Sequence, residues 1–435
     1  MPQPPVPRPS SPGAPPALAR PLRRGRLLPL LAAAALNACA ADQFERPGAD
    51  DEAAYAAAHP YYAEYCAVSQ IKKKPGFGAD IRGGIGGHSV FYLNGACRVD
   101  GAGYPVLRVC DGGGSTPPDG VGLSMNAHFS NAKWVATPGR EFFFHGGLAP
   151  AAPVTRAAYA AVQARAKRLG IYDGVTFHEE VFDAMPKGWA REDWRYEMSV
   201  ATDYALSLGR GRFCARVPVD RPAMARMVAF LNAENEPYRR GDAVFRWSVF
   251  RDNCIHLAHN ALAAAGLWDE WRTHRPLLVA MFDFPVPKNE FVNLMRRTND
   301  QLPLRMADLD GAARQSLARF GTLPTAPGGL AEARPPQRPN EVYDTDVGLI
   351  FYDEPNFGPY QRWFDAIWRE PRYWDATANL QRFRTVYQRI TATGGPDALH
   401  AYAARQLRAV DQALASPAPG PAGPAQAAPQ RAALR

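Results

Sequence analysis

A cysteine at the start of a predicted helix is the residue of this chain best suited to nucleophilic chemistry. Cys254 follows Asp252 and Asn253, two residue types that cap helices, and apolar residues recur after it at helical spacing until Gly266. Free backbone N–H groups and the positive end of the helix dipole favour the thiolate at such a position. The alternative is a small structural cysteine on a packed helix.

A nucleophilic cysteine needs an imidazole to take its proton, and His88 is the histidine that the sequence offers. His88 follows the glycine-rich residues 83–87 and opens a predicted strand, where another element can approach the backbone closely. A later segment carries Asn126 and His128, either of which can hold the imidazole ring in one tautomer. Together these residues predict a nucleophilic cysteine with a histidine as its base.

Two other functions remain open from the residues alone. His256 and His259 lie three positions apart on one helical face, so Cys254 and His88 could complete a metal site with them. The chain lacks the His-Glu-x-x-His pattern of zinc proteases, and we expect neither a metal nor a cofactor. The third possibility is a protein without catalysis that uses the same domain for binding.

The N-terminal residues predict export. An arginine-rich stretch precedes the apolar residues 27–36, which are too few for a stable membrane span, and small residues follow. Residues 1–38 are therefore expected to be a signal peptide, and residues 36–39 resemble a bacterial lipobox. Cys39 would then carry a lipid that anchors the protein in the cell envelope, facing the periplasm, at the outer rather than the inner membrane.

The charge of the chain gives little reason to expect nucleic acid as a partner. The formal charge is +8, and five arginines without any acidic residue precede Cys39, so the mature chain carries 8 − 5 = +3. Four cysteines remain beside Cys39 and Cys254. An exported protein can oxidise them to disulfides, and three pairings are possible among Cys66, Cys97, Cys110 and Cys214.

Periodicity and punctuation indicate a mixed α+β chain. Strands are predicted at residues 88–93, 104–110, 121–126, 133–135, 141–144 and 212–218, and helices at 157–169, 197–206 and 221–232, before the helix of Cys254. A membrane-proximal segment is expected at 39–75, with an Ala/Tyr-rich helix over 50–70, and the main domain at 76–320. The remaining regions are a Pro/Gly-rich linker, an accessory helical region and a disordered tail, at 321–340, 341–415 and 416–435.

The order of these motifs resembles the circularly permuted, papain-like branch of the NlpC superfamily, to which lecithin retinol acyltransferase belongs. Residues 87–93, Gly-His-Ser-Val-Phe-Tyr-Leu, supply the histidine strand, and residues 253–257, Asn-Cys-Ile-His-Leu, supply the cysteine helix. The chain is closer still to the periplasmic domain of Lnb-type lipoprotein N-acyltransferases. Residues 126–142 and the run from Val217 to Cys254 carry this likeness, which covers about residues 80 to 265.

The resemblance implies an antiparallel sheet packed on the cysteine helix, with a helical C-terminal extension in this chain. It implies hydrolysis or acyl transfer through a thioester, with Cys254 as nucleophile, His88 as base, and Asn126 or His128 as the third group. The expected substrate is an envelope lipid, lipoprotein or peptide, met at the membrane by the lipid-anchored protein. The chain departs from the family at Ile255 and His256, where a pair such as Thr-Thr is common.

Overall fold

The computed structural model describes residues 41–46, 55–56, 58–79, 86–110, 120–282, 285–302, 304–323, 328–353, 358–393 and 397–415. The predicted signal peptide, the lipidation site Cys39 and the predicted tail 416–435 lie outside these residues. The described residues belong to one compact unit.

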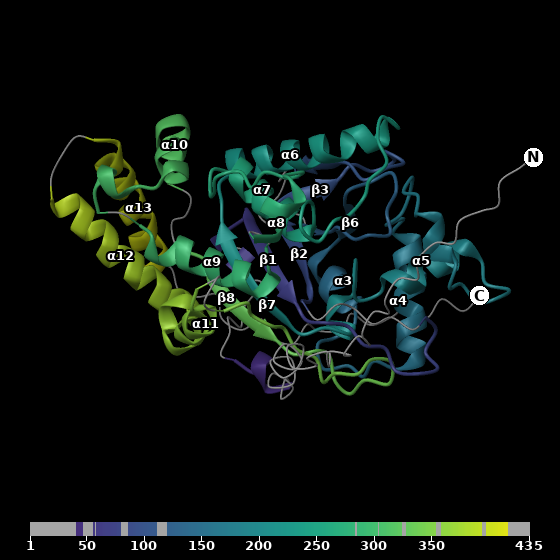
Figure 1. Ribbon diagram of the computed structural model, residues 1–435. Helices are drawn as coiled ribbons and strands as arrows, with labels where there is room; N and C mark the ends of the chain where they lie inside the picture. Colours follow the sequence, from purple (N-terminus) through teal and green to yellow (C-terminus); the bar gives the residue numbers. More distant parts are fainter. Residues whose placement is uncertain are drawn as a thin grey trace, which may run out of the picture. The chain divides into compact units, whose positions relative to one another are not determined.

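An antiparallel sheet is the centre of this unit (Figure 1). Its strand order is β6-β5-β2-β1-β7-β8, and each neighbouring pair is antiparallel. A separate hairpin pairs β3 with β4. The strands are β1 Tyr62–Val68, β2 His88–Asn94, β3 Ala96–Arg98, β4 Leu107–Val109, β5 Val121–Ser124, β6 Val135–Pro138, β7 Arg212–Pro218 and β8 Leu330–Arg334.

The helix expected over residues 50–70 is wrong for its later part, where residues 62–68 form the central strand β1, whereas residues 55–56 and 58 are helical. All seven residues of β1 are buried, and its neighbours are β2 on one side and β7 on the other. Alternate residues of β1 face opposite layers of the protein, so both faces need apolar side chains. An Ala/Tyr-rich run meets this need as well as it meets that of a helix, and composition alone cannot distinguish the two.

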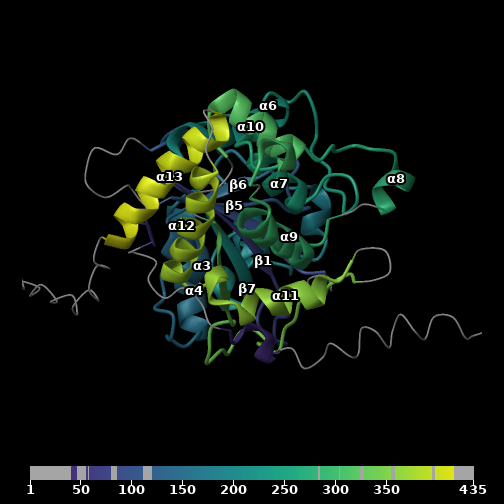
Figure 2. The ribbon, with the colours of Figure 1, turned by 90° about the vertical axis from the view of Figure 1, so that its left-hand side faces the viewer.

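Helices cover both faces of the sheet (Figures 1 and 2). On one face, α3 (Arg140–His145) contributes Phe143 and Phe144 to a cluster with Tyr62, Val90 and Tyr92. On the other face lie α6 (Arg221–Arg239), α7 (Cys254–Ala264) and α9 (Pro287–Asp300), whose apolar residues join those of β1, β2 and β5 in the main core. The core therefore has two layers that the sheet separates.

The other helices lie between these elements or in the C-terminal region. The α-helices are α4 Arg156–Arg168, α5 Arg191–Ser199, α8 Leu277–Phe282, α10 Gly311–Phe320, α11 Tyr360–Arg369, α12 Ala376–Ala392 and α13 Ala398–Ala415. Short 3₁₀ helices occur at Ala41–Phe44, Glu179–Phe182, Leu206–Leu208, Met306–Asp308 and Pro371–Tyr373.

The C-terminal region is helical, as expected. It also includes α10, which precedes the expected linker 321–340 in the chain. Leu317 of α10 packs in a second apolar cluster with Phe383 and Tyr387 of α12 and Tyr402 of α13. The expected linker 321–340 contains β8, whose residues pair with β7. The chain thus leaves α10, adds an edge strand to the sheet, and returns to the helical cluster.

The expected α+β class, the antiparallel sheet and the helical C-terminal region are confirmed. Two disulfides select one of the three possible pairings: Cys66 with Cys214 across β1 and β7, and Cys97 with Cys110 beside the β3–β4 hairpin. Among the helices that the structure describes, none is both long enough and apolar enough to cross a bilayer.

Candidate active site

Cys254 is the first residue of α7 and lies at the capped end of that helix. The Asn253 side chain accepts hydrogen bonds from the backbone N–H groups of Ile255 and His256, at 2.9 and 3.2 Å, which completes the N-cap. The imidazole of His256 accepts in return from the Asn253 backbone N–H at 3.3 Å. The predicted start of the helix is therefore confirmed, and Gly266, with φ of +88°, follows its end.

The thiol of Cys254 is free, whereas the other cysteines of the described residues are paired in disulfides. The residue keeps part of its surface exposed, but the surrounding groups enclose the sulfur and raise the pKa of Cys254 by burial. The Ser89 hydroxyl and backbone groups of Ser89, Cys254 and Ile255 oppose that rise. Ser89 Oγ has no regular hydrogen-bond partner among the described residues.

His88 is the first residue of β2, and a serine fixes its ring. His88 Nε2 lies 3.2 Å from Ser124 Oγ, and the same hydroxyl lies 2.7 Å from Asp203 Oδ1 and 3.1 Å from the Thr202 carbonyl. The buried Asp203 carboxyl, at the shortest of these distances, takes the single hydroxyl proton of Ser124 in preference to the imidazole nitrogen. Nε2 therefore donates to Ser124, and the lone pair of Nδ1 is the basic site of the ring.

Asp203 is the buried carboxylate that organises this hydrogen-bond chain. It accepts from Ser124, from Asn126 Nδ2 at 2.7 and 2.8 Å, and from the Tyr172 hydroxyl at 2.8 Å. Burial raises the pKa of Asp203, while these donors and the nearby His128 lower it. Sequence reasoning missed Asp203 because it lies in an irregular segment, about eighty residues after the strand that it supports.

The two residues proposed as the third group have other partners. Asn126 holds Asp203 and accepts from the backbone N–H of His128 at 2.7 Å. The His128 ring stacks on Phe177, with 6.0 Å between the ring centroids, and burial lowers the pKa of His128. The side chain that contacts His88 is Ser124, a member of the same predicted segment.

The alternation of β2 places Ser89 and His88 differently with respect to Cys254. Phe91, two positions after Ser89, belongs to the core layer that contains α7, whereas Val90, two positions after His88, belongs to the layer of α3. Because successive side chains of a strand point to opposite faces, Ser89 lies on the Cys254 side of the sheet. His88 lies on the opposite side, at the end of the strand.

Arg210 is a buried cation whose charge acts on both His88 and Cys254. Its guanidinium donates to the Ala201 carbonyl at 2.5 Å and to the Ser69 carbonyl, which holds it beside the ends of β1 and β7. Burial lowers the pKa of Arg210 to about 10, while Cys254 and Asp203 are among the groups that raise it. Burial, followed by the charge of Arg210, lowers the pKa of His88 to about 3, so the imidazole is neutral near pH 7.

The two helix histidines of the metal alternative each have another partner for one ring nitrogen. His256 Nδ1 takes part in the helix cap, and His259 Nδ1 lies 2.7 Å from Glu290 Oε1. Among the described residues, the metal-ligand atoms that converge are those of Glu64, Cys66 and Cys214, and the two sulfurs of that group form a disulfide.

No protein-family model, curated protein or solved structure matches this chain.

Proposed function

We propose that this protein is a thiol-dependent acyltransferase or amide or ester hydrolase of the cell envelope, with Cys254 as nucleophile and His88 as base. One observation carries the proposal. The Ser124–Asp203 chain holds the His88 ring with Nδ1 as its basic nitrogen, at the start of a strand that packs on the helix of Cys254. The same assignment supports the papain-like arrangement that the sequence resembles.

The chemistry follows from these groups. His88 Nδ1 takes the proton of the Cys254 thiol, and the thiolate attacks the carbonyl carbon of an ester or amide. The tetrahedral oxyanion accepts a hydrogen bond from the backbone N–H of Cys254. The imidazolium returns its proton to the leaving alcohol or amine, which leaves a thioester on Cys254. Water or an amine then attacks the thioester, and the free thiol is restored.

Burial and Arg210 keep His88 uncharged near pH 7, so Nδ1 carries a lone pair at rest. The same two effects oppose the imidazolium that proton transfer forms, so the transfer requires a substrate-bound state in which the pKa of His88 is higher. Arg210 also favours the thiolate of Cys254, which offsets part of the burial that raises the thiol pKa. The reaction requires the His88 ring to reach the thiol around the end of β2, where Gly87 precedes it with φ of +75°.

The intact thiol is a second argument for a role of Cys254. The chain forms two disulfides, which persist in oxidising compartments such as the bacterial periplasm. Cys254 is the free cysteine of the described residues, so its thiol is available for a chemical use. Export, the lipid on Cys39 and a location at the outer membrane remain part of this proposal.

A binding protein without catalysis is the second candidate. The alternation of side chains along β2 favours this binding role, because Ser89 rather than His88 lies on the Cys254 side of the sheet. The raised pKa of Cys254 is also typical of a structural cysteine. In that case the Ser124–Asp203 chain has a structural role.

Hydrolysis of a p-nitrophenyl fatty-acyl ester by the purified protein separates the two candidates. We expect a burst of p-nitrophenol equal to the protein concentration, and an acyl adduct on Cys254 by mass spectrometry. Cys254→Ala should remove both, and His88→Gln should lower the rate of acylation by roughly a hundredfold or more. His400→Gln, at a histidine of α13 that pairs with Asp397, is the matched control and should acylate as the wild type does.

Acylation that survives Cys254→Ala would exclude the thiol mechanism. A wild-type protein that shows no burst with esters, thioesters or phospholipids, and whose thiol reacts no faster than that of the His88→Gln variant, would leave the binding candidate.

A further inference from the structure

An exposed apolar helix, α8, follows the Cys254 helix in the chain. In α8, Leu277, Leu278, Val279 and Met281 are 52, 71, 50 and 47% exposed, whereas Ala280 is buried. Successive residues of a helix are turned by about 100°, so these four side chains leave the helix on several sides and Ala280 faces the protein. Figure 2 shows α8 standing away from the body of the domain.

The loop before Cys254 adds further apolar side chains to this region. Val244, Trp247 and Val249 are exposed, and the Val249 carbonyl accepts from the Asn253 side chain at 2.7 Å. Two hydrogen bonds join this loop to the segment before α8. The His274 N–H donates to the Arg251 carbonyl at 3.1 Å, and Arg251 donates to the His274 carbonyl at 3.3 Å.

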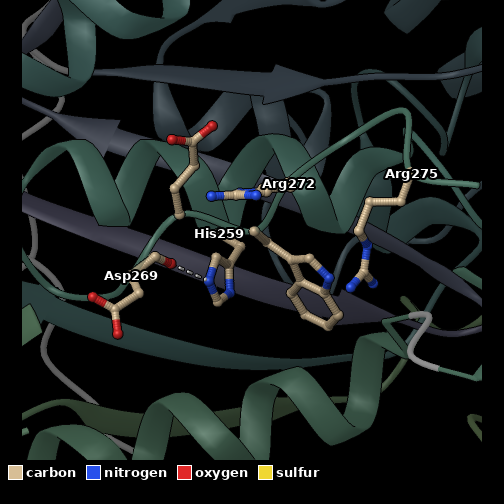
Figure 3. Close-up of a pocket in the computed structure, with 6 residues that line it drawn as sticks. His259, Asp269, Arg272 and Arg275 are labelled. Carbon is tan, nitrogen blue, oxygen red and sulfur yellow. Dashed lines mark hydrogen bonds between the residues drawn. The ribbon is translucent and has the colours of Figure 1, made fainter. Parts of the chain in front are cut away.

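Basic side chains border the apolar ones. Residues 244–251 and 269–282 together contain Arg246, Arg251, Arg272 and Arg275, against the acidic residues Asp269 and Glu270. Figure 3 shows Arg272 and Arg275 beside a pocket that they share with His259 and Asp269. The pocket has a volume of about 420 Å³. Most of its lining residues belong to the segment 269–275, which directly precedes α8 in the chain.

We propose that α8 and residues 244–250 form a membrane-docking surface that inserts into an anionic phospholipid bilayer. The apolar side chains would enter the interface between headgroups and acyl chains, and the arginines would meet the phosphates. Trp247 suits this depth, because indole rings favour the membrane interface. The proposal rests on this surface and holds whether or not Cys254 is catalytic.

The shape of the surface favours a bilayer over a second copy of the chain. A protein partner contacts one face of a protruding helix, whereas the apolar side chains of α8 leave it on several sides. A fluid acyl layer can surround a protruding turn on all of them. Docking by residues 244–250 would also bring the N-terminus of α7 close to the membrane, because the Asn253 side chain donates a hydrogen bond to the Val249 carbonyl.

Vesicle flotation of the full chain tests the proposal, with Cys39→Ala introduced throughout so that no lipid anchor contributes. We expect the protein to float with vesicles of phosphatidylcholine and phosphatidylglycerol, and far less with phosphatidylcholine alone. Leu277→Ser/Leu278→Ser should lower binding by roughly tenfold or more, since two leucines leave the acyl layer. Arg272→Ala and Arg246→Ala should each lower binding to the anionic vesicles by about fivefold.

Leu304→Ser is the matched control, because Leu304 is also exposed but lies outside the docking surface, and it should float as the parent protein does. Cys254→Ala should float as well, so the outcome does not depend on the thiol chemistry. Equal flotation of the Leu277→Ser/Leu278→Ser variant, or equal binding to the two kinds of vesicle, would overturn the proposal. A dimer in sedimentation velocity that this variant dissociates, without flotation of the parent, would also overturn it and identify an interface between copies.

Discussion

His88 Nε2 lies 3.2 Å from Ser124 Oγ, and this contact determines which nitrogen of the ring is basic. The Ser124 hydroxyl proton goes to Asp203 Oδ1, so Nε2 carries the proton that it shares with Ser124. The Ser124–Asp203 chain thereby fixes the tautomer of the imidazole, as a third group does in catalytic triads, while the ring stays on the side of the sheet opposite Cys254.

Removal of either member of this chain should slow acylation of Cys254. We expect Ser124→Ala and Asp203→Asn to lower kcat for the acyl ester by roughly tenfold to a hundredfold, with little change in KM. The reason is that Nε2–H loses its acceptor and the ring is no longer held in one tautomer. The burst rate, measured as a function of pH, is the readout, because a merely structural role would leave its pH profile unchanged.

A matched control exists on the same carboxylate. Tyr172→Phe removes one donor to Asp203 at 2.8 Å but leaves the bond from Ser124 in place. Its burst rate should stay within about threefold of the wild type, since only the positioning of Asp203 is weakened. Equal losses in Tyr172→Phe and Ser124→Ala would mean that the chain supports the fold rather than the imidazole.

Ser89 should set the reactivity of the Cys254 thiol. Burial raises the pKa of Cys254, and the Ser89 hydroxyl is the side chain that opposes the rise. Ser89→Ala should therefore move the pKa of Cys254 higher still and slow alkylation by iodoacetamide at pH 8. The pH dependence of the alkylation rate measures this directly. An unchanged midpoint would show that the hydroxyl does not contact the thiol.

Local signals predicted the elements that position the site. Asn253 and Gly266 specify the two ends of α7, and the Asp220 side chain caps α6 by accepting from the Ala223 N–H at 2.7 Å. Caps depend on a few adjacent residues, so a sequence reveals them without knowledge of the fold. The same reasoning placed His88 at the start of a strand.

The predictions that depend on tertiary packing were wrong or incomplete. The aromatic run at 141–144 predicted a strand, but it forms the short helix α3, bounded by Gly139 and Gly146 and buried against the sheet. Phe143 packs on Gly122 of β5, where a Cβ would lie 2.1 Å from its ring. Asp203 reaches Ser124 only through the fold, so no local pattern could reveal it. The pairing of Cys66 with Cys214 likewise follows from the order of β1 and β7.

The neutral state of His88 should destabilise the protein in acid. Burial lowers the pKa of His88 from 6.5 to about 3, so between these values the unfolded chain binds a proton that the folded chain excludes. The free energy of unfolding therefore falls as pH drops from 6.5 towards 3, by a few kcal/mol at most from this residue because it is partly exposed. His88→Gln should flatten this part of the pH–stability curve, as measured by urea unfolding.

His256 is buried and its pKa is also lowered to about 3, so some acid sensitivity should remain after His88→Gln. An identical slope in the wild type and the His88→Gln variant would mean that the folded state accepts the proton on His88 freely.

Glu332 on β8 should be among the carboxylates that contribute most to stability. Burial alone raises the pKa of Glu332, but the guanidinium groups of Arg216, Arg212 and Arg140 outweigh it and hold the pKa well below its usual range. Arg216 Nη2 lies 2.6 Å from Glu332 Oε2. The folded state thus binds the proton less readily than the unfolded chain, so this stability is complete above pH 4.5 and is lost as pH falls below it.

Glu332→Gln should lower the free energy of unfolding at pH 7 by about 3 to 5 kcal/mol, because buried guanidinium groups lose their counter-charge. The difference from the wild type should shrink as pH falls below 4.5, since the unfolded wild-type chain then binds a proton at Glu332 that the folded state excludes. Urea unfolding at pH 7 and pH 3.5 measures both effects. Glu179→Gln is the control, because its pair with Arg191 is exposed, and it should change stability by less than about 1 kcal/mol. A Glu332→Gln variant as stable as the wild type at pH 7 would show that the buried arginines do not depend on this carboxylate, and that β8 is held to β7 by its backbone pairing and apolar contacts.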